Sequence, residues 1–308
     1  MMFSLDEIIE NYNLIRNNKD YVLMEFDLNL KRVLDYGYEM SDRTGTGTKF
    51  LPFISTQIDI SERVPVPTRR RTNWKSMLKE YLWFLTGSDK ISDLEKMGSK
   101  VWNPWKNEEW AKENNFEPTS IGYGYGPNLI HCGGDINNLC ENPGVNQIDY
   151  VINELKTNPN SRRILFSFWR GDKVQKKDVF LNCCHIIYHF IVTPNESGEM
   201  VDLNCCVYAR STDAFVGALS TNLQGAAFYT YMIAQQVGMN PCKINFISGN
   251  FHIYNNHIPL VEEYLNRPIV SSPKLILNKK YSIYDYSADD FVLEDYNPLG
   301  KMEVPISV

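Results

Sequence analysis

A long run of residues without charge, 223–237, constrains the fold of this chain more than any other stretch. The run contains no Asp, Glu, Lys or Arg. A helix that is apolar on nearly every side has to be buried, so the rest of the domain must surround it. Strand-like runs precede and follow it, at 201–208 and 243–247. This alternation predicts an α/β domain with a central buried helix.

The length of 308 residues and the composition predict one ordinary globular domain. Hydrophobic residues make up 43% and charged residues 22%, and no internal repeat or low-complexity linker divides the chain. The formal net charge of -6 argues against non-specific binding of nucleic acid, so an anionic ligand would have to meet local arginines. No run of about 18 apolar residues occurs, which argues against a membrane-spanning helix.

The first residues and the cysteines predict the compartment. The opening segment is acidic and lacks the basic and apolar regions of a secretory signal peptide. The seven cysteines are an odd number without C-x-x-C spacing, which argues against a zinc site. We therefore expect a cytoplasmic protein with reduced thiols and no metal.

Two adjacent cysteines and a histidine, Cys183, Cys184 and His185, lie between strand-like runs at 163–169 and 186–192. A thiol at the start of a buried strand can face a cleft, and its thiolate is a strong nucleophile if positive charge lowers its pKa. The alternative is that both cysteines are small core residues. This stretch alone leaves both interpretations open.

Residues 42–48 combine two glycines, three threonines and Arg43. Such a segment can offer backbone N–H groups, hydroxyls and a guanidinium to a phosphate, although a simple hairpin turn has the same composition. No Gly-Lys-Ser/Thr follows, so it is not a Walker loop. The basic triplet 69–71 is typical of a solvated surface.

Arg210, Ser211 and Asp213 follow the strand before the central helix, a good place for an oxyanion or phosphate site. Arg162 and Arg163 are adjacent at the start of another strand. Neighbouring strand residues point to opposite faces, so this pair suits binding at an interface better than one local salt bridge.

Residues 73–85 have the spacing of a helix with an apolar face, and Glu80 lies among its aromatic residues. A buried carboxylate there would need a function or a partner, whereas an exposed helix face would need neither. Trp102 and Trp105 are three residues apart and can form a flat wall for a ring system or simply pack.

Asn222, at the start of the central helix, is by default an N-cap. His252 and Tyr254 are two residues apart and would face the same side of an extended segment. Residues 121–126 alternate glycine and tyrosine, a backbone that can approach a ligand closely, and a loop insertion is predicted around 127–146. The tail 301–308 is apolar to its last residue, which predicts docking.

Together these segments resemble the thymidylate synthase family over nearly the whole chain. Any one motif is weak, but they occur in the order that the family has. The matching segments are 42–48, 80–85, Trp102 with Trp105, 125–126, 161–163, 184–185, 210–213, Asn222, 234–236, 252–257 and 304–308.

The resemblance implies an α/β (α+β) fold, a single domain spanning 1–308, with a bent mixed sheet and a long buried central helix. It also implies a homodimer formed through the sheets, in which each site borrows arginines from the partner chain. A pyrimidine nucleoside monophosphate would be the substrate and 5,10-methylenetetrahydrofolate the cosubstrate. Cys184 would attack C6 of the base, after which C5 accepts the one-carbon unit. A thiolate among four arginines should have a depressed pKa.

The resemblance also implies a role for each matched residue. Glu80 would organise water and proton transfer, and Tyr125 and His185 would lie near the reacting base. The implied catalytic residues are Cys184, Glu80, Tyr125, His185 and Asp213. The implied substrate-binding residues are Arg43, Arg162, Arg163, Arg210, Ser211, Asn222, His252 and Tyr254. The implied folate-binding residues are Trp102, Trp105, Asp213, Gly217 and Val308.

Several positions depart from the family pattern. Asn182 and Cys183 precede the nucleophile where prolines are expected, and His189 replaces a glutamine. Asn250 replaces an aspartate two residues before the site histidine. Two segments also differ: 127–130 replaces Lys-Gln-Trp-Arg, and 218–221 is one residue longer than the pattern and ends in Thr221, not Phe.

The hydroxymethylase branch of the family shows several similar losses, and there water completes the product. We therefore expect 5-hydroxymethylation of CMP, dCMP or dUMP. Thymidylate synthesis, with release of dihydrofolate, is the first alternative, and a nucleotide-binding paralogue without catalysis is the second. Asn222 suits uracil and is compatible with cytosine, so base and sugar stay open.

Overall fold

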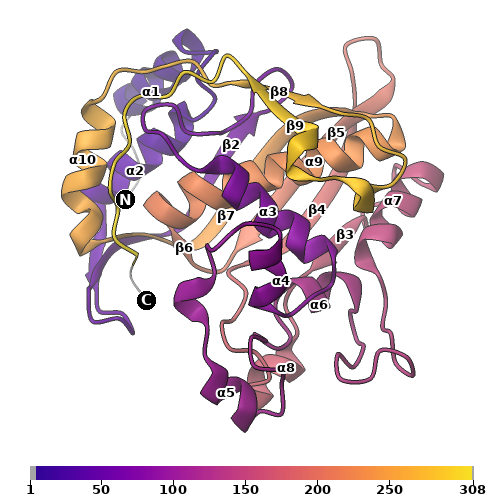
Figure 1. Ribbon diagram of the computed structural model, residues 1–308. Helices are drawn as coiled ribbons and strands as arrows, with labels where there is room; N and C mark the ends of the chain where they lie inside the picture. Colours follow the sequence, from indigo (N-terminus) through magenta and orange to yellow (C-terminus); the bar gives the residue numbers. More distant parts are fainter. Residues whose placement is uncertain (1–4, 307–308) are drawn as a thin grey trace.

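The computed structural model describes residues 5–306, which fold around one mixed sheet (Figure 1). The strand order is β1-β2-β7-β5-β4-β3, and β6 pairs with β7. β7 is parallel to β5 and β6, and the other neighbours are antiparallel. The predicted α/β class with a mixed sheet is confirmed. The strands are β1 (Tyr38–Met40), β2 (Thr48–Asp59), β3 (Leu165–Ser167), β4 (His185–Pro194), β5 (Met200–Ala209), β6 (Thr212–Asp213) and β7 (Asn240–Tyr254).

The uncharged run forms α9 (Leu223–Val237), which is buried over most of its length as predicted. Figure 1 shows it lying across the sheet, where it contacts β5 and β7, and α3 (Trp74–Leu85) packs against it. A Cβ at Gly225 would overlap the Tyr81 ring, so this glycine lets α9 and α3 approach closely.

The opposite face of the sheet is much less covered within residues 5–306. Its side chains include Phe53 of β2, which is 76% exposed, and Leu165 and Ile191, which are 38% and 37% exposed. Phe53 has a φ of 54°, a conformation that an aromatic residue rarely adopts. Exposed apolar side chains on one face of a sheet are typical of a surface that another protein chain covers.

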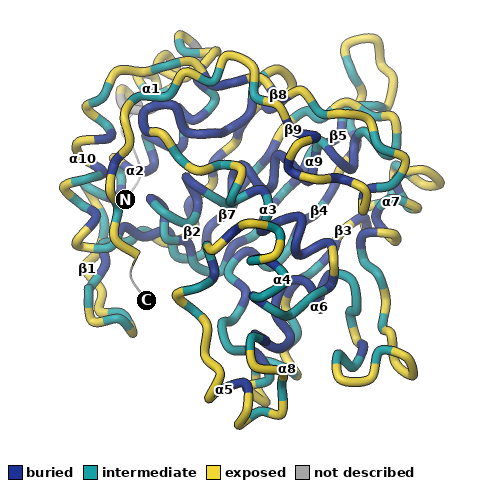
Figure 2. Tube along the Cα trace, viewed as in Figure 1, coloured by how far each residue is buried: buried dark blue, intermediate teal, exposed yellow. Residues whose placement is uncertain are grey.

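The other elements surround this layered core (Figure 2). A small hairpin sheet pairs β8 (Lys274–Leu277) with β9 (Phe291–Glu294). The remaining α-helices are α1 (Leu5–Asn17), α2 (Met24–Tyr36), α4 (Ile91–Lys96), α5 (Glu108–Glu113), α6 (Tyr125–Ile130), α7 (Gln147–Thr157), α8 (Gly171–Lys176) and α10 (Ile258–Asn266). The short 3-10 and π-helical segments are η1 (Asn103–Trp105), η2 (Ala214–Asn222), η3 (Asn255–His257), η4 (Ile283–Asp285) and η5 (Ala288–Asp290).

Two predictions for segments outside the candidate site are wrong. Residues 127–130 belong to α6, so the predicted loop begins only at residue 131. Arg69 and Arg70 are buried, not solvated. Arg69 forms an ion pair with buried Asp27, with Nη1 and Oδ2 2.8 Å apart, which offsets the cost of removing both charges from water.

Candidate active site

Cys184 lies one residue before β4, half-buried, whereas Cys183 points into the hydrophobic core. The Sγ atom of Cys184 is 3.6 Å from Nη2 of Arg210. The Cys184 N–H donates a 2.7 Å hydrogen bond to the Tyr125 hydroxyl. Two adjacent cysteines therefore have different environments, and only the second has both access and a neighbouring cation.

Burial raises the pKa of the Cys184 thiol, while Arg210 and Arg43 lower it and Asp213 raises it. The net direction is upward, so the expectation of a depressed pKa is wrong for this chain by itself. Only two of the four arginines that were expected to surround the thiol act on it here. Their charge does not compensate for the loss of water around a thiolate.

Glu80 on α3 is buried, and its partner is Trp102. Nε1 of Trp102 donates a 2.9 Å hydrogen bond to Oε1 of Glu80. Burial raises the pKa of Glu80 to about 7, and the Trp102 hydrogen bond opposes that rise. The exposed-face alternative is therefore wrong. A carboxyl group that titrates near neutral pH can both donate and accept a proton.

His185 is enclosed by aromatic rings. Its ring stacks on Tyr125, with centroids 4.5 Å apart, and its Nδ1 lies 3.1 Å from the Tyr188 hydroxyl. Burial lowers the pKa of His185 to about 3, so the imidazole is neutral at physiological pH. Trp102 and Trp105 also pack together, with centroids 5.6 Å apart. Nε1 of Trp105 is buried without a hydrogen-bond partner in the described part of the chain.

The Arg210 side chain holds the segment that leads to Cys184. Its Nε donates to the Cys183 carbonyl and its Nη2 to the Asn182 carbonyl, both at 2.8 Å. Ser211 follows at the surface of the same turn, half-buried. The guanidinium is thus fixed by carbonyl oxygens and keeps its positive charge available beside the thiol.

Asp42 orders the glycine-threonine segment that contains Arg43. Its carboxylate accepts the N–H groups of Thr44 at 2.6 Å and Gly47 at 2.7 Å. Arg43 itself is exposed, and its charge reaches both Cys184 and Tyr254. This segment and the Cys184 turn therefore meet at one place, although they are far apart in sequence.

His252 and Tyr254 lie on β7 with ring centroids 5.2 Å apart, close together as predicted. Nδ1 of His252 is 2.8 Å from Oδ1 of Asn250, and burial lowers the pKa of His252. An amide oxygen there fixes the proton on Nδ1 of the neutral ring, so Nε2 is left as an acceptor. Burial raises the pKa of Tyr254.

Asp213 caps η2, which leads to Asn222. Oδ1 of Asp213 accepts the N–H groups of Phe215 and Val216, each at 3.1 Å. Asn222 continues the helical backbone into α9 and does not cap it, contrary to the default prediction. Gly217 lies near both Asp213 and Asn222. A Cβ atom built on Gly217 would be 3.5 Å from the Asn222 side chain and 3.6 Å from that of Asp213, which are ordinary van der Waals distances.

Sequence reasoning missed Arg70. Its Nη2 donates to the Phe215 carbonyl at 2.7 Å and to the Ser220 hydroxyl at 2.6 Å, so a buried cation holds η2 at two points. Burial lowers the pKa of Arg70 to about 10. The only signal was a run of three arginines, and a run of identical residues has no periodicity that separates a buried member from exposed ones.

Arg162 and Arg163 are exposed ahead of β3, at the edge of the sheet. Neither is among the groups whose charge acts on Cys184. Within one chain, the structure does not bring them to the thiol. Val308 lies outside the described residues.

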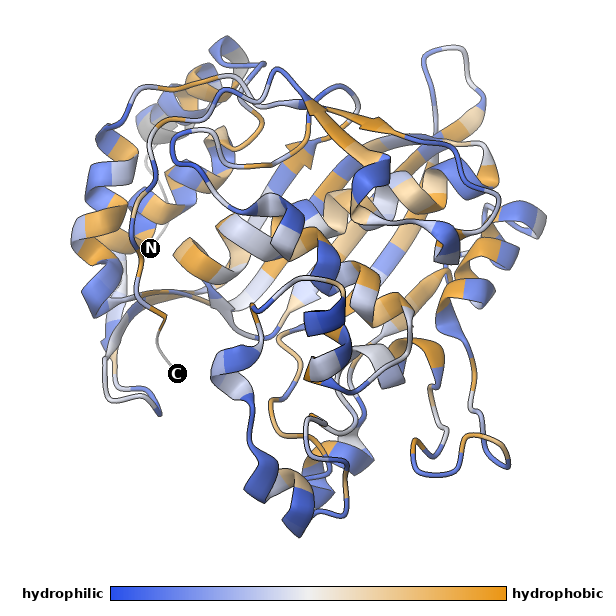
Figure 3. Ribbon diagram, in the orientation of Figure 1, coloured by the Kyte–Doolittle hydropathy of each residue, from blue (hydrophilic) through white to orange (hydrophobic). Residues whose placement is uncertain are grey.

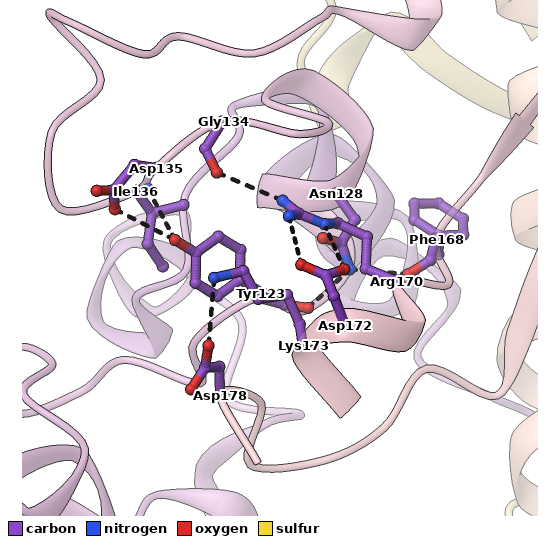
Figure 4. A network of polar contacts seen from close by, with 10 residues as sticks. All are labelled: Tyr123, Asn128, Gly134, Asp135, Ile136, Phe168, Arg170, Asp172, Lys173 and Asp178. Atoms are coloured by element: carbon purple, nitrogen blue, oxygen red, sulfur yellow. Dashed lines mark hydrogen bonds and ion pairs between the residues drawn. The ribbon is translucent and has the colours of Figure 1, made fainter. Parts of the chain in front are cut away.

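Tyr123 of the glycine-tyrosine segment contacts the loop after α6 and helix α8 (Figure 4). The Tyr123 ring lies under Lys173, with Nζ 3.7 Å from the centroid, and its hydroxyl donates to Asp135 at 3.2 Å. Arg170 adds a long contact to the Gly134 carbonyl. These contacts fasten the loop after α6 to α8, just ahead of the Cys184 segment.

We predict that Glu80 titrates near pH 7 and that Trp102→Phe raises its midpoint by about one pH unit or more, because a hydrogen bond to the carboxylate is lost. Carboxyl carbon NMR of labelled protein measures this. Because the folded pKa exceeds the unfolded one, the contribution of Glu80 to stability is present at low pH and is lost as pH rises through about 7. Trp110→Phe, which alters an indole packed on Phe116, is the matched control. An unchanged midpoint in Trp102→Phe would contradict the assignment.

Between residues 5 and 306, no group of three His, Cys, Asp or Glu side chains is arranged to hold a metal ion. No helix in that range is long and apolar enough to cross a membrane. Figure 3 shows hydrophobic and hydrophilic residues alternating along the peripheral helices.

Comparison with known proteins identifies the family. The family model described as thymidylate synthase matches residues 24–308. A thymidylate synthase of Francisella philomiragia is 34% identical over 291 residues, which cover 91% of this chain and 97% of the relative. The thymidylate synthase of Francisella tularensis subsp. holarctica, strain LVS, has the same identity and coverage. The chain therefore belongs to the thymidylate synthase family, whose enzymes transfer a one-carbon unit to a pyrimidine.

Proposed function

We propose that this chain transfers a one-carbon unit to C5 of a pyrimidine nucleoside monophosphate and that water completes the product as a 5-hydroxymethyl nucleotide. Cys184 is the nucleophile: it adds to C6, which makes C5 nucleophilic. Its access and its 3.6 Å contact with Arg210 support this role. Arg210 stabilises the thiolate, and a bound phosphate with its further arginines would complete the electrostatic environment.

The nucleotide would bind between the two loops that meet at Cys184. Arg43, Arg210 and Ser211 would bind the phosphate, with Arg162 and Arg163 supplied by the partner chain. His252 and Tyr254 would bind the sugar, because Nε2 of His252 is left as an acceptor. Asn222 would read the base edge.

Two features fit a folate cosubstrate. Trp105 has a buried N–H without a partner, and Gly217 leaves space beside Asp213. When bound, methylenetetrahydrofolate supplies the one-carbon unit. Trp102, Trp105, Asp213 and Gly217 would hold it, and the C-terminal tail would cover it.

Glu80 would transfer protons to and from the base, and it would also position a water molecule that takes part in this proton transfer. Its pKa near 7 suits both directions of transfer. Tyr125 and neutral His185 would form the wall beside the reacting base. The Tyr125 hydroxyl bonds to the Cys184 N–H, and the His185 ring stacks on the Tyr125 ring.

The single observation that supports water addition is the π-helical conformation of η2. This helix contains residues 218–221, the segment that we expect to be one residue longer than the family pattern. Thr221 stands at the position where the family pattern has an aromatic residue. Its hydroxyl donates a 3.3 Å hydrogen bond to Sδ of Met77. A missing aromatic wall would loosen the reduced pterin, and a displacement of about 1 Å can cost ~100-fold in hydride transfer. A looser site also admits water.

Thymidylate synthesis is the second candidate. The names of the relatives favour it, as does the Glu80–Trp102 pair at its matched positions. A binding protein without catalysis is disfavoured by the accessible thiol beside Arg210.

One incubation separates these candidates. The protein is mixed with methylenetetrahydrofolate and, separately, UMP, dUMP, CMP and dCMP, and products are identified by mass spectrometry while dihydrofolate is followed by absorbance. We expect a hydroxymethyl nucleotide without dihydrofolate. A methylated nucleotide with stoichiometric dihydrofolate would assign thymidylate synthesis, and no product from any substrate would contradict both activities.

The two cysteines provide a matched pair of variants. Cys184→Ser should reduce turnover by roughly 10³-fold or more while the melting temperature stays close to that of the unmodified chain, because only the nucleophile is weakened. Cys183→Ser should cost about 1–3 kcal/mol of stability, because a buried hydroxyl lacks a partner, and should keep most of the activity. The reverse pattern would show that Cys183 is the nucleophile.

The poorly covered sheet face and the distant arginines together support a dimer with shared sites. Arg163→Ala and Cys184→Ser proteins should each be inactive, and mixing them should restore activity through hybrid dimers that contain one intact site. The matched control mixes Cys184→Ser with Glu80→Gln, whose defects lie in the same site, so no hybrid is intact. Once mass spectrometry shows subunit exchange, an absence of recovery in the first mixture would rule out shared arginines.

A further inference from the structure

One buried imidazole lies between Asp213 and the C-terminal tail. His257, at the end of η3, is fully buried. Its Nε2 is 2.7 Å from the Pro305 carbonyl oxygen. Its Nδ1 faces Oδ1 of Asp213 at 4.0 Å and has no hydrogen-bond partner in the described part of the chain. The same side chain therefore contacts the tail with one nitrogen and faces the candidate site with the other.

The tail packs against the body up to Val304, which is half-buried against the core. The Leu299 N–H donates to the Thr68 carbonyl at 2.7 Å, and Met302 is buried. After that, Pro305 and Ile306 are exposed. In residues 303–306, the contact of Pro305 with His257 is the one hydrogen bond that joins the tail to the body. Figure 1 shows this last part, yellow, descending towards the C label.

A neutral imidazole has a single proton to place. The Pro305 carbonyl can only accept, so the docked tail requires the proton on Nε2. Nδ1 then presents a lone pair to the Asp213 carboxylate, and 4.0 Å is too long for a hydrogen bond. When the tail leaves, the proton can move to Nδ1, from which Asp213 is the nearest acceptor.

That transfer would affect η2. Oδ1 of Asp213 already accepts two N–H groups, those of Phe215 and Val216, and a carboxylate oxygen has about two lone-pair sites. A third donor would displace one of them or rotate the carboxylate. Asp213 and the start of η2 therefore respond to the position of the proton on His257.

We propose that His257 is a positioning residue that couples the C-terminal tail to Asp213 through its tautomer. The docked tail holds the proton on Nε2 and leaves the carboxylate of Asp213 free to cap η2 and to accept a donor from the folate. The released tail lets Nδ1–H engage Asp213. The folate part of this inference rests on the proposed function, whereas the tautomer exchange does not.

The tautomer can be measured without any assay of activity. Nitrogen NMR of protein with labelled histidine distinguishes Nε2–H from Nδ1–H in the neutral ring, at a pH above the ordinary histidine range. We compare the full chain with a variant that ends at Val304. His257 should carry its proton on Nε2 in the full chain and on Nδ1 in the shortened one. The same tautomer in both would overturn the proposal.

Two substitutions separate the two nitrogens. The amide of His257→Gln can reach the Pro305 carbonyl as Nε2 does, whereas that of His257→Asn lies where Nδ1 faces Asp213. His257→Asn should raise the KM for the folate about tenfold and expose the tail to carboxypeptidase, with the KM for the nucleotide changed less than about twofold. His257→Gln should keep the folate KM within about threefold.

The matched controls are His131→Asn and His131→Gln, because His131 also bonds a proline carbonyl, that of Pro143, at 3.0 Å. Neither control should change tail digestion or the folate KM. Equal losses in both His257 variants would reduce His257 to a structural residue and overturn the coupling. If the tautomer exchanges but no nucleotide is converted, the proposed function fails and the coupling of tail to Asp213 stands.

Discussion

The arrangement of the candidate site depends on Arg210 more than on any other residue. Its backbone N–H donates to the Cys184 carbonyl at 2.8 Å, and its carbonyl accepts the Asn250 N–H at 3.1 Å. Its side chain donates to the two carbonyls just before Cys184. One residue therefore ties the thiol segment to the end of β5 and to β7. Because its partners are carbonyls and not carboxylates, its positive charge is not cancelled where the thiol and an anion would need it.

Burial controls the protonation of the groups around this centre. The core that α9 requires also encloses Glu80 and His185, raising the pKa of the first to about 7 and lowering that of the second to about 3. One group is thereby poised to exchange a proton and the other is kept neutral. Burial also raises the pKa of the Cys184 thiol, and the positive charges of Arg210 and Arg43 oppose that rise.

The segment from Asp213 to Asn222 leads from the end of the sheet into α9. Residues 214–222 of this segment form a π-helix, a rare conformation that is held here by the Asp213 carboxylate at its start and by buried Arg70, which bonds to Phe215 and Ser220. His257 lies behind the cap and contacts the tail. The segment is thus held by a residue that is distant from it in sequence, Arg70.

The sequence by itself determined the elements whose signal is local. The absence of charge over 223–237 predicted a buried helix, and apolar strand-like runs predicted most of β4 and β5 and the middle part of β7. The motif order also predicted which segments matter, and the structure brings Cys184, Arg210, Arg43 and His252 into electrostatic reach of one another or of Asp213. Only the tertiary structure decided which of two like residues is buried. It separated Cys184 from Cys183, buried Arg69 and Arg70, gave Glu80 its indole partner and placed His257 between the tail and Asp213. Burial, pKa and hydrogen bonding depend on what distant segments place around a side chain, and local periodicity carries no information about that.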